Sequence, residues 1–129
     1  MDKEIQDEMI QEIGSLIINH NNYAKDQWRA IALVGDFSDG MEAMHGYAYF
    51  EDGEFASRIA GFDCLDKIQE LREEMIKCGD KGWSQCLIHI VRPDLQITIR
   101  FEYENPKRWS PGKVALDMRD FAELLKPSF

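Results

Sequence analysis

The feature that most constrains the fold is a pair of alternating segments, Trp83 to Arg92 and Leu95 to Glu104, joined at Pro93-Asp94. When the second segment folds back on the first, Ile90 faces Ile97, Ile88 faces Ile99, and Cys86 faces Phe101. The other face of this hairpin is mixed in character. Because a slip by one residue would turn every side chain to the wrong face, the pattern predicts one antiparallel register with one face in a core.

Three further strands are expected in the first half of the chain. Residues alternate from Trp28 to Val34, and the segment from Gly35 to Gly40 breaks this strand. A second strand is predicted over Ala43–Phe50 and a third over Phe55–Ile59. Between them lies Asp52-Gly53, a pair that supplies the positive φ angles of a tight hairpin turn.

Three helices complete the pattern. Apolar side chains at steps of three and four from Ile5 to Ile17, and again from Leu65 to Ile76, predict two amphipathic helices. Asp63 is the expected N-cap of the second helix, and Gly79 is placed to end it. A last helix is predicted from about Val114 to Pro127.

The resulting order, α-β-β-β-α-β-β-α, predicts an α+β two-layer sandwich. Its sheet has five strands and is mainly antiparallel, with the helices chiefly on one face and the other face partly wet. The 129 residues contain no linker, repeat or low-complexity stretch, so we expect a single domain over 1–129.

Residues that could carry chemistry are scattered. His20, His45 and His89 lack a metal-ligand spacing, and structural roles are expected for the two that lie in strands. No phosphate-binding glycine loop or nucleophile motif is present. Glu102 and Glu104 share one side of a strand; a glycosidase could use such a pair, but it is ordinary on a wet sheet face. We therefore expect no enzyme activity, no cofactor and no metal.

Charge is the stronger indication of function. The chain has 24 Asp and Glu against 15 Lys and Arg, a net charge of −9. Such a body repels phosphate backbones and attracts basic proteins, although plain solubility explains the same count. No apolar run is long enough for a membrane span, and the acidic start lacks the order of a signal peptide. Three cysteines without a C-x-x-C spacing suit a reducing cytoplasm.

The placement of the acidic residues suggests where a protein partner would bind. Six carboxylates around the first three strands form a predicted rim: Asp36, Asp39, Glu42, Glu51, Asp52 and Glu54. The wet sheet face with Glu102 and Glu104 is the alternative surface. Trp109, in a loop between two prolines, either plugs the end of the sheet or adds a recognition surface.

Several segments resemble the YezG-like immunity (antitoxin) family. The resemblance covers roughly Ile5 to Pro111 and is carried by Gly82–Ile88, Ile97–Tyr103 and Arg108–Pro111, with Trp28, Asp52-Gly53 and Leu65–Ile76 in the matching order. It implies a non-enzymatic protein that binds a secreted polymorphic toxin, often a nuclease, in the cytosol and blocks it. The family has no catalytic residues to carry over, and no motif fixes its toxin contacts.

The expected function is that of a cytoplasmic immunity protein for a cognate, basic toxin domain, acting as a monomer or weak dimer. The alternative is a type III secretion-type chaperone, a class that shares this element order, dimerises and wraps an unfolded effector segment. A third hypothesis, small-molecule or enzymatic chemistry at Glu102 and its neighbours, would show as a melting-temperature shift with metals or substrates.

Overall fold

A computed structural model describes residues 2–25, 27–40, 42–110 and 118–129, without the side chains of Asp39 and Met118. Its helices and strands are α1 (Lys3–Asn19), α2 (Asn21–Ala24), β1 (Ala30–Asp36), β2 (Ala43–Tyr49), β3 (Phe55–Ser57), α3 (Phe62–Lys77), β4 (Gln85–Val91), β5 (Gln96–Glu102) and α4 (Met118–Leu125). All neighbouring strands are antiparallel, in the order β3-β2-β1-β4-β5. The predicted α+β fold and element order are confirmed, and the four-residue α2 is an addition.

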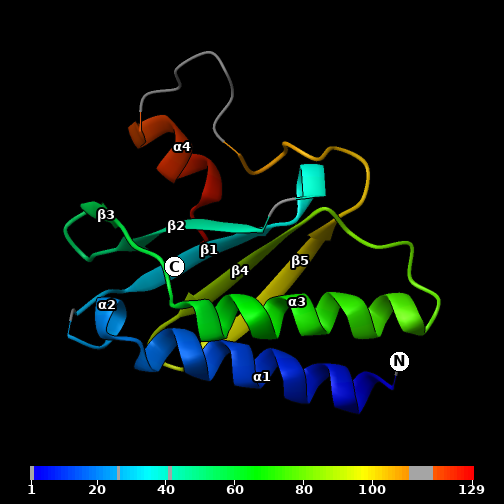
Figure 1. Ribbon diagram of the computed structural model, residues 1–129. Coiled ribbons are helices and arrows are strands. Elements are labelled where there is room, and N and C mark those ends of the chain that lie inside the picture. The colour runs from blue at the N-terminus through cyan, green and yellow to red at the C-terminus, as the bar shows by residue number, and fades with distance from the viewer. Residues whose placement is uncertain (1, 26, 41, 111–117) are drawn as a thin grey trace.

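Helices lie on both faces of the sheet (Figure 1). α1 and α3 lie side by side on one face, and their apolar sides close the larger core with Ile31 and Leu33 of β1. α4 lies on the other face, where Phe121 and Leu125 join a second, smaller core. β1 is therefore covered on both sides, and its burial is unbroken over 30–35.

The register between β4 and β5 is the predicted one. The structure pairs Ile90 with Ile97, Ile88 with Ile99, and Cys86 with Phe101. All six side chains lie in or against the core beneath α1 and α3. Trp28 and Trp83, which precede β1 and β4, are buried in the same core.

The start of α3 corrects one prediction. Its N-cap is Gly61, which makes no side-chain cap, and Asp63 lies inside the first turn instead. There the Asp63 carboxylate accepts a hydrogen bond from the backbone N–H of Cys64 at 2.8 Å. A negative charge in the first turn still suits the helix dipole. Gly79 follows the helix with φ of 102°, the left-handed conformation expected of it.

The second sheet face is closed at its centre and open at β5. α4 covers the centre, whereas Gln96, Thr98 and Arg100 of β5 and Ser57 of β3 are exposed, so the expected wet face is confined to the two edge strands. The predicted start of the last helix, Val114, lies outside the described residues. No helix in the described ranges is both long and apolar enough to cross a membrane.

Candidate functional site

The carboxylates predicted to form one rim lie in two places. Asp36 ends β1 and pairs with Ala43 at the start of β2, next to the exposed Glu42. The turn 51–54 lies beyond the other end of β2. A strand of seven residues spans about 20 Å, so a single rim is wrong: these residues are close in sequence, but β2 runs between them. The Asp39 backbone lies in a short 3-10 turn beside the first group, and its side chain is outside the described part.

Asp36 is held in a polar network. Its carboxylate accepts hydrogen bonds from the Ser38 backbone and hydroxyl at 2.9 and 2.6 Å, from Gln85 at 3.2 Å and from Ser110 at 3.1 Å. Burial alone would raise the pKa of Asp36, but these hydrogen bonds outweigh it and leave the pKa below its ordinary value. Gln85 is fully buried and also donates to the Ser110 hydroxyl at 2.7 Å. The network ties the ends of β1 and β4 to the segment that follows β5.

Glu102 is likewise engaged inside the molecule. Its carboxylate pairs with Arg108 at 2.8 Å and accepts the backbone N–H groups of Glu104 at 3.0 Å and Asn105 at 3.3 Å. The hydrogen bond from Arg108 is the main cause that lowers the pKa of Glu102 to about 2. Glu104 is exposed, but it follows the end of β5 in a bend. The predicted carboxylate pair on one strand face is therefore not formed.

Trp109 plugs the end of the sheet. Its side chain is buried in the second core. Its backbone N–H donates to Gln85 Oε1 at 2.9 Å, and its carbonyl oxygen lies 2.6 Å from His45 Nε2. The guanidinium groups of Arg100 and Arg108 lie 5.7 and 5.1 Å from the ring centroid. Of the two predicted roles the structure shows the plug, so Trp109 offers no open surface to a partner.

Two further side chains fix the C-terminal segment through its backbone. The Tyr49 hydroxyl donates to the carbonyl of Ala122 at 2.6 Å, and His89 Nε2 lies 2.7 Å from the carbonyl oxygen of Leu125. Burial lowers the pKa of His89. Together with the His45 contact described above, these bonds confirm the structural roles expected for both strand histidines.

The β2–β3 turn keeps its acidic side chains at the surface. Asp52 accepts the backbone N–H of Glu54 at 3.0 Å, and Gly53 takes φ of 84°, as the turn chemistry predicts. Glu51 pairs with Arg29 at 3.0 Å. One of the three carboxylates is thus already matched by a cation.

The largest collection of acidic residues, which sequence reasoning missed, lies on α1 and α3. The carboxylates are Asp2, Glu4, Asp7, Glu8 and Glu12 on α1 with its N-cap, and Asp63, Asp66, Glu70, Glu73 and Glu74 on α3. Only Lys3, Lys67, Arg72 and Lys77 oppose them, so this acidic helix layer carries −6 of the net charge of −9. All ten carboxylates except the half-exposed Glu74 are exposed. The spacing of Glu4, Glu8 and Glu12, one helical step of four apart, could have revealed it.

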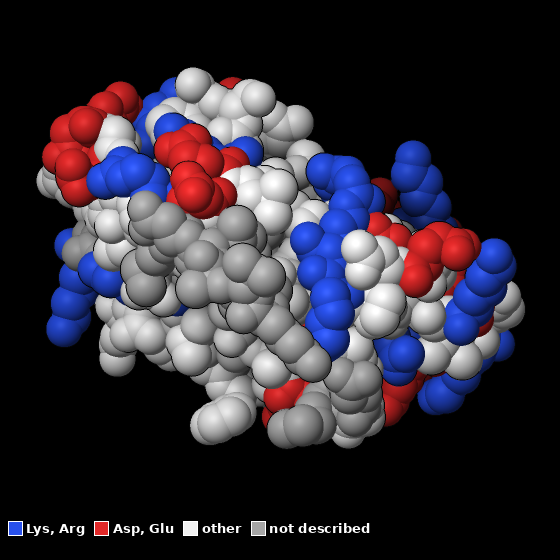
Figure 2. Space-filling view, turned by 90° about the horizontal axis from the view of Figure 1, so that it is seen from above, with Lys and Arg blue, Asp and Glu red and all other residues white. Residues whose placement is uncertain are grey.

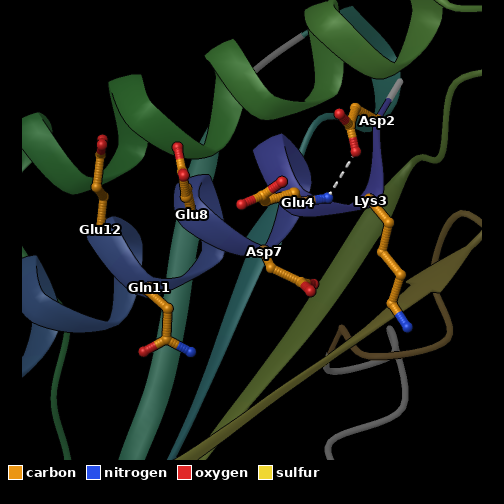
Figure 3. Close-up of a pocket in the computed structure, with 7 residues that line it drawn as sticks. All are labelled: Asp2, Lys3, Glu4, Asp7, Glu8, Gln11 and Glu12. Carbon is orange, nitrogen blue, oxygen red and sulfur yellow. Dashed lines mark hydrogen bonds between the residues drawn. The ribbon is translucent and has the colours of Figure 1, made fainter.

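Figure 3 shows how the α1 part of the layer is arranged around an open hollow. Glu8 and Glu12 point toward α3, whereas Asp7 and Gln11 point the other way. Asp2 caps the helix through a hydrogen bond from the backbone N–H of Glu4 at 3.0 Å. Because the side chains leave the helix in several directions, their charge is spread over its outer surface.

Few of these carboxylates are neutralised. Lys67 pairs with Glu12 at 2.7 Å and Glu70 at 3.5 Å, and Lys77 pairs with Glu74 at 3.1 Å. Within the described ranges the other seven carboxylates of the layer have no cationic partner. Exposed pairs of this kind contribute little stability, so the layer is not needed to hold the two helices together.

The opposite face differs in charge. Figure 2 shows it from the α4 side, with a row of Lys and Arg side chains across the surface and acidic groups on either side of the row. Arg100 and Arg108 lie against Trp109, and Lys126 lies over the Tyr49 ring. The molecule is therefore polarised, with the excess of negative charge on the helix layer.

Two of the three cysteines, Cys64 and Cys86, are buried, whereas Cys78 is exposed. Burial raises the thiol pKa values of Cys64 and Cys86 to about 12, which keeps both protonated and unreactive at neutral pH. Across the described ranges no group of three or more His, Cys, Asp or Glu side chains is placed to hold a metal ion.

No protein-family model matches the chain, and no curated protein matches it either.

Proposed function

We propose that this chain is an immunity protein that binds a basic, nuclease-type toxin domain in the cytosol and covers its active surface. The observation that carries the proposal is the acidic helix layer, which gathers −6 of the net charge of −9 on two packed helices. The resemblance of Gly82–Ile88, Ile97–Tyr103 and Arg108–Pro111 to the YezG-like family supports the same function.

Charge complementarity gives the physical reason. A nuclease binds phosphates and so presents basic side chains around its active site. The carboxylates of the helix layer are complementary to that positive charge. The opposite sides of both helices are buried in the core, through Ile13 and Ile17 of α1 and Ile68 and Leu71 of α3. Because these helices are already packed, binding orders little backbone. Electrostatic complementarity of this kind raises the association rate constant toward about 10⁸–10⁹ M⁻¹s⁻¹ at low salt.

The unpaired, exposed carboxylates of the layer are the proposed contacts. Glu4, Glu8 and Glu73 have no cationic partner in the part of the chain that the structure describes, so a basic partner displaces no ion pair there. Asp36 and Glu102, by contrast, hold internal hydrogen bonds, and a partner would have to break them first.

The direct test uses the protein domain encoded immediately upstream of this chain, which under the proposal is the toxin. The domain is expressed in bacteria alone and together with the chain. We expect growth arrest without the chain and normal growth with it. A helix-layer variant (Glu4→Lys, Glu8→Lys, Glu73→Lys) should lose protection, while a turn variant with the same charge change (Glu51→Lys, Asp52→Lys, Glu54→Lys) should keep it. Growth arrest that persists although the wild-type chain is present and folded would contradict the function.

The element order favours one second function, that of a type III secretion-type chaperone, because that class has the same α-β-β-β-α-β-β-α order. The condition of the bound partner separates the two. An immunity protein binds a folded toxin domain, which regains activity when it is released. A chaperone binds an extended segment, which proteases digest once it is released.

A further inference from the structure

The two edge strands of the sheet differ in how well they are protected. β3 has only three residues and follows the acidic turn 51–54, two features that discourage pairing with another chain. β5 has seven residues, Gln-Ile-Thr-Ile-Arg-Phe-Glu, with no proline, glycine or lysine among them. Regular, β-branched edges of this length are templates for a further strand.

The outer side of β5 is open in the described part of the chain, where the strand pairs only with β4. Gln96, Thr98 and Arg100 are exposed on the second sheet face. Ile97, Ile99 and Phe101 are half-buried on the helix side, so each keeps apolar surface at the edge. A strand added here would satisfy the outward backbone groups and cover that apolar surface.

The strand is complementary to itself. We propose that β5 pairs antiparallel with β5 of a second copy, about a two-fold axis at Ile99, to form a dimer with one continuous sheet. This register pairs Ile97 with Phe101, Ile99 with Ile99, Thr98 with Arg100, and Gln96 with Glu102 of the second copy. Apolar residues meet apolar residues, and no like charges are directly opposed, which is the arrangement that favours cross-strand pairing.

Shifted registers are poorer. A shift by two residues in either direction loses the two terminal pairs, because only the proposed register aligns the whole strand. In one direction the shift also sets Arg100 opposite Arg100 of the second copy. Odd shifts would place helix-side residues against those of the other face, because side chains alternate along a strand.

α1 flanks the open edge with little negative charge. Gly14 lies against Ile97, which places this helix beside β5. Asp7 and Gln11 point away from α3 (Figure 3). Only one of these two side chains, Asp7, is negatively charged. Glu8 and Glu12 of the acidic helix layer, which point toward α3, would therefore stay accessible in both copies. The inference does not rest on the proposed function, and oligomeric state alone does not separate an immunity protein from a chaperone.

Salt gives the dimer a signature opposite to that of toxin binding. Two chains of −9 each repel one another, and salt screens this repulsion, so the dimer should strengthen as salt rises. Binding of a basic toxin domain should weaken over the same range. The dimer and the binding of a toxin domain can therefore be tested independently, and the failure of one does not decide the other.

The test is sedimentation equilibrium of the purified full chain and of two variants at the exposed Thr98. We expect the molar mass to rise with concentration from 15.0 kDa toward twice that value. Thr98→Lys, which faces Arg100 of the second copy twice per dimer, should weaken the dimer about tenfold, and Thr98→Glu should strengthen it. Ser57→Lys and Ser57→Glu, on the opposite edge strand β3, are the matched controls: they make the same change in net charge away from the interface and should alter the dimer far less than the Thr98 variants do.

Three results would overturn the proposal. The first is a molar mass of 15.0 kDa at every concentration and salt. The second is a dimer that neither Thr98 variant alters, which places the interface elsewhere. The third is a dimer that both variants weaken, or that Thr98→Lys strengthens, since these outcomes belong to the two shifted registers.

Discussion

Individual side chains on the second face act mainly by holding backbone. Tyr49 and His89 each bond to a main-chain carbonyl of the segment 122–125, and His45 does the same at Trp109. At His89, burial opposes protonation, which makes the stability of the fold depend on pH.

His89 is expected to make the free energy of unfolding depend on pH. Burial, with a smaller effect of Arg100, lowers its pKa below the ordinary 6.5, although the Leu125 carbonyl opposes the shift. The unfolded chain therefore binds this proton more readily, so stability is full above pH 6.5 and is lost as pH falls toward the folded-state pKa. We expect the free energy of unfolding to fall by up to about 1.4 kcal/mol per pH unit from this one group.

Urea unfolding at pH 7.5, 6.5 and 5.5 checks this expectation. His89→Gln keeps an N–H donor near the Leu125 carbonyl but does not titrate, so its stability should fall less between these pH values. An equal fall in the wild type and in the variant would show that His89 contributes nothing to the pH dependence.

At the scale of elements, β1 and β2 approach so closely that one position between them accepts only glycine. A Cβ on Gly46 would meet the backbone of β1, at the carbonyl oxygen of Ala32 and at Leu33. Backbone cannot turn aside as a side-chain tip can. We expect Gly46→Ala to lower the free energy of unfolding by about 3 kcal/mol.

Gly14→Ala is the matched control. Its Cβ would meet the side-chain end of Ile97, which is half-buried and can rotate, and alanine favours a helix over glycine by about 1 kcal/mol. Its loss should therefore be clearly smaller in thermal or urea unfolding. Equal losses for the two variants would contradict this account of the β1–β2 contact.

Most of the fold could be predicted because its signals are local. The β4–β5 register follows from alternation alone, and Gly53 and Gly79 mark their turns by type. The closure of the second face could not be predicted, because Ala30 and Ala32 on that side of β1 are small and give little indication of what packs on them. Asp36 and Glu102 were predicted as contacts for a partner because their own partners are not evident in the sequence: Gln85 reaches Asp36 only in the folded sheet, and Arg108 reaches Glu102 only when the loop after β5 turns back.

On the scale of the whole molecule, the polar groups that hold the fold together and the carboxylates that are free to bind lie on opposite faces. On the second face, polar side chains form hydrogen bonds to the backbone of Trp109 and of the C-terminal segment. In the acidic helix layer, by contrast, seven carboxylates have no cationic partner in the described ranges. The six carboxylates of the predicted rim are near one another in sequence, but the full length of β2 separates them in space. A surface charge that the fold does not use is available for binding.

The measurement that tests this claim most directly is the association rate of the purified chain with the domain encoded immediately upstream, the toxin under the proposed function, followed by stopped-flow fluorescence as salt is raised. Between about 0.01 M and about 1 M salt the screening length falls from about 30 Å to about 3 Å. We predict a steep fall in the association rate constant for the wild type and the turn variant, and a slow rate with a weak salt dependence for the helix-layer variant. A rate constant that salt does not change, or turn reversals that slow binding as much as helix-layer reversals, would contradict the account.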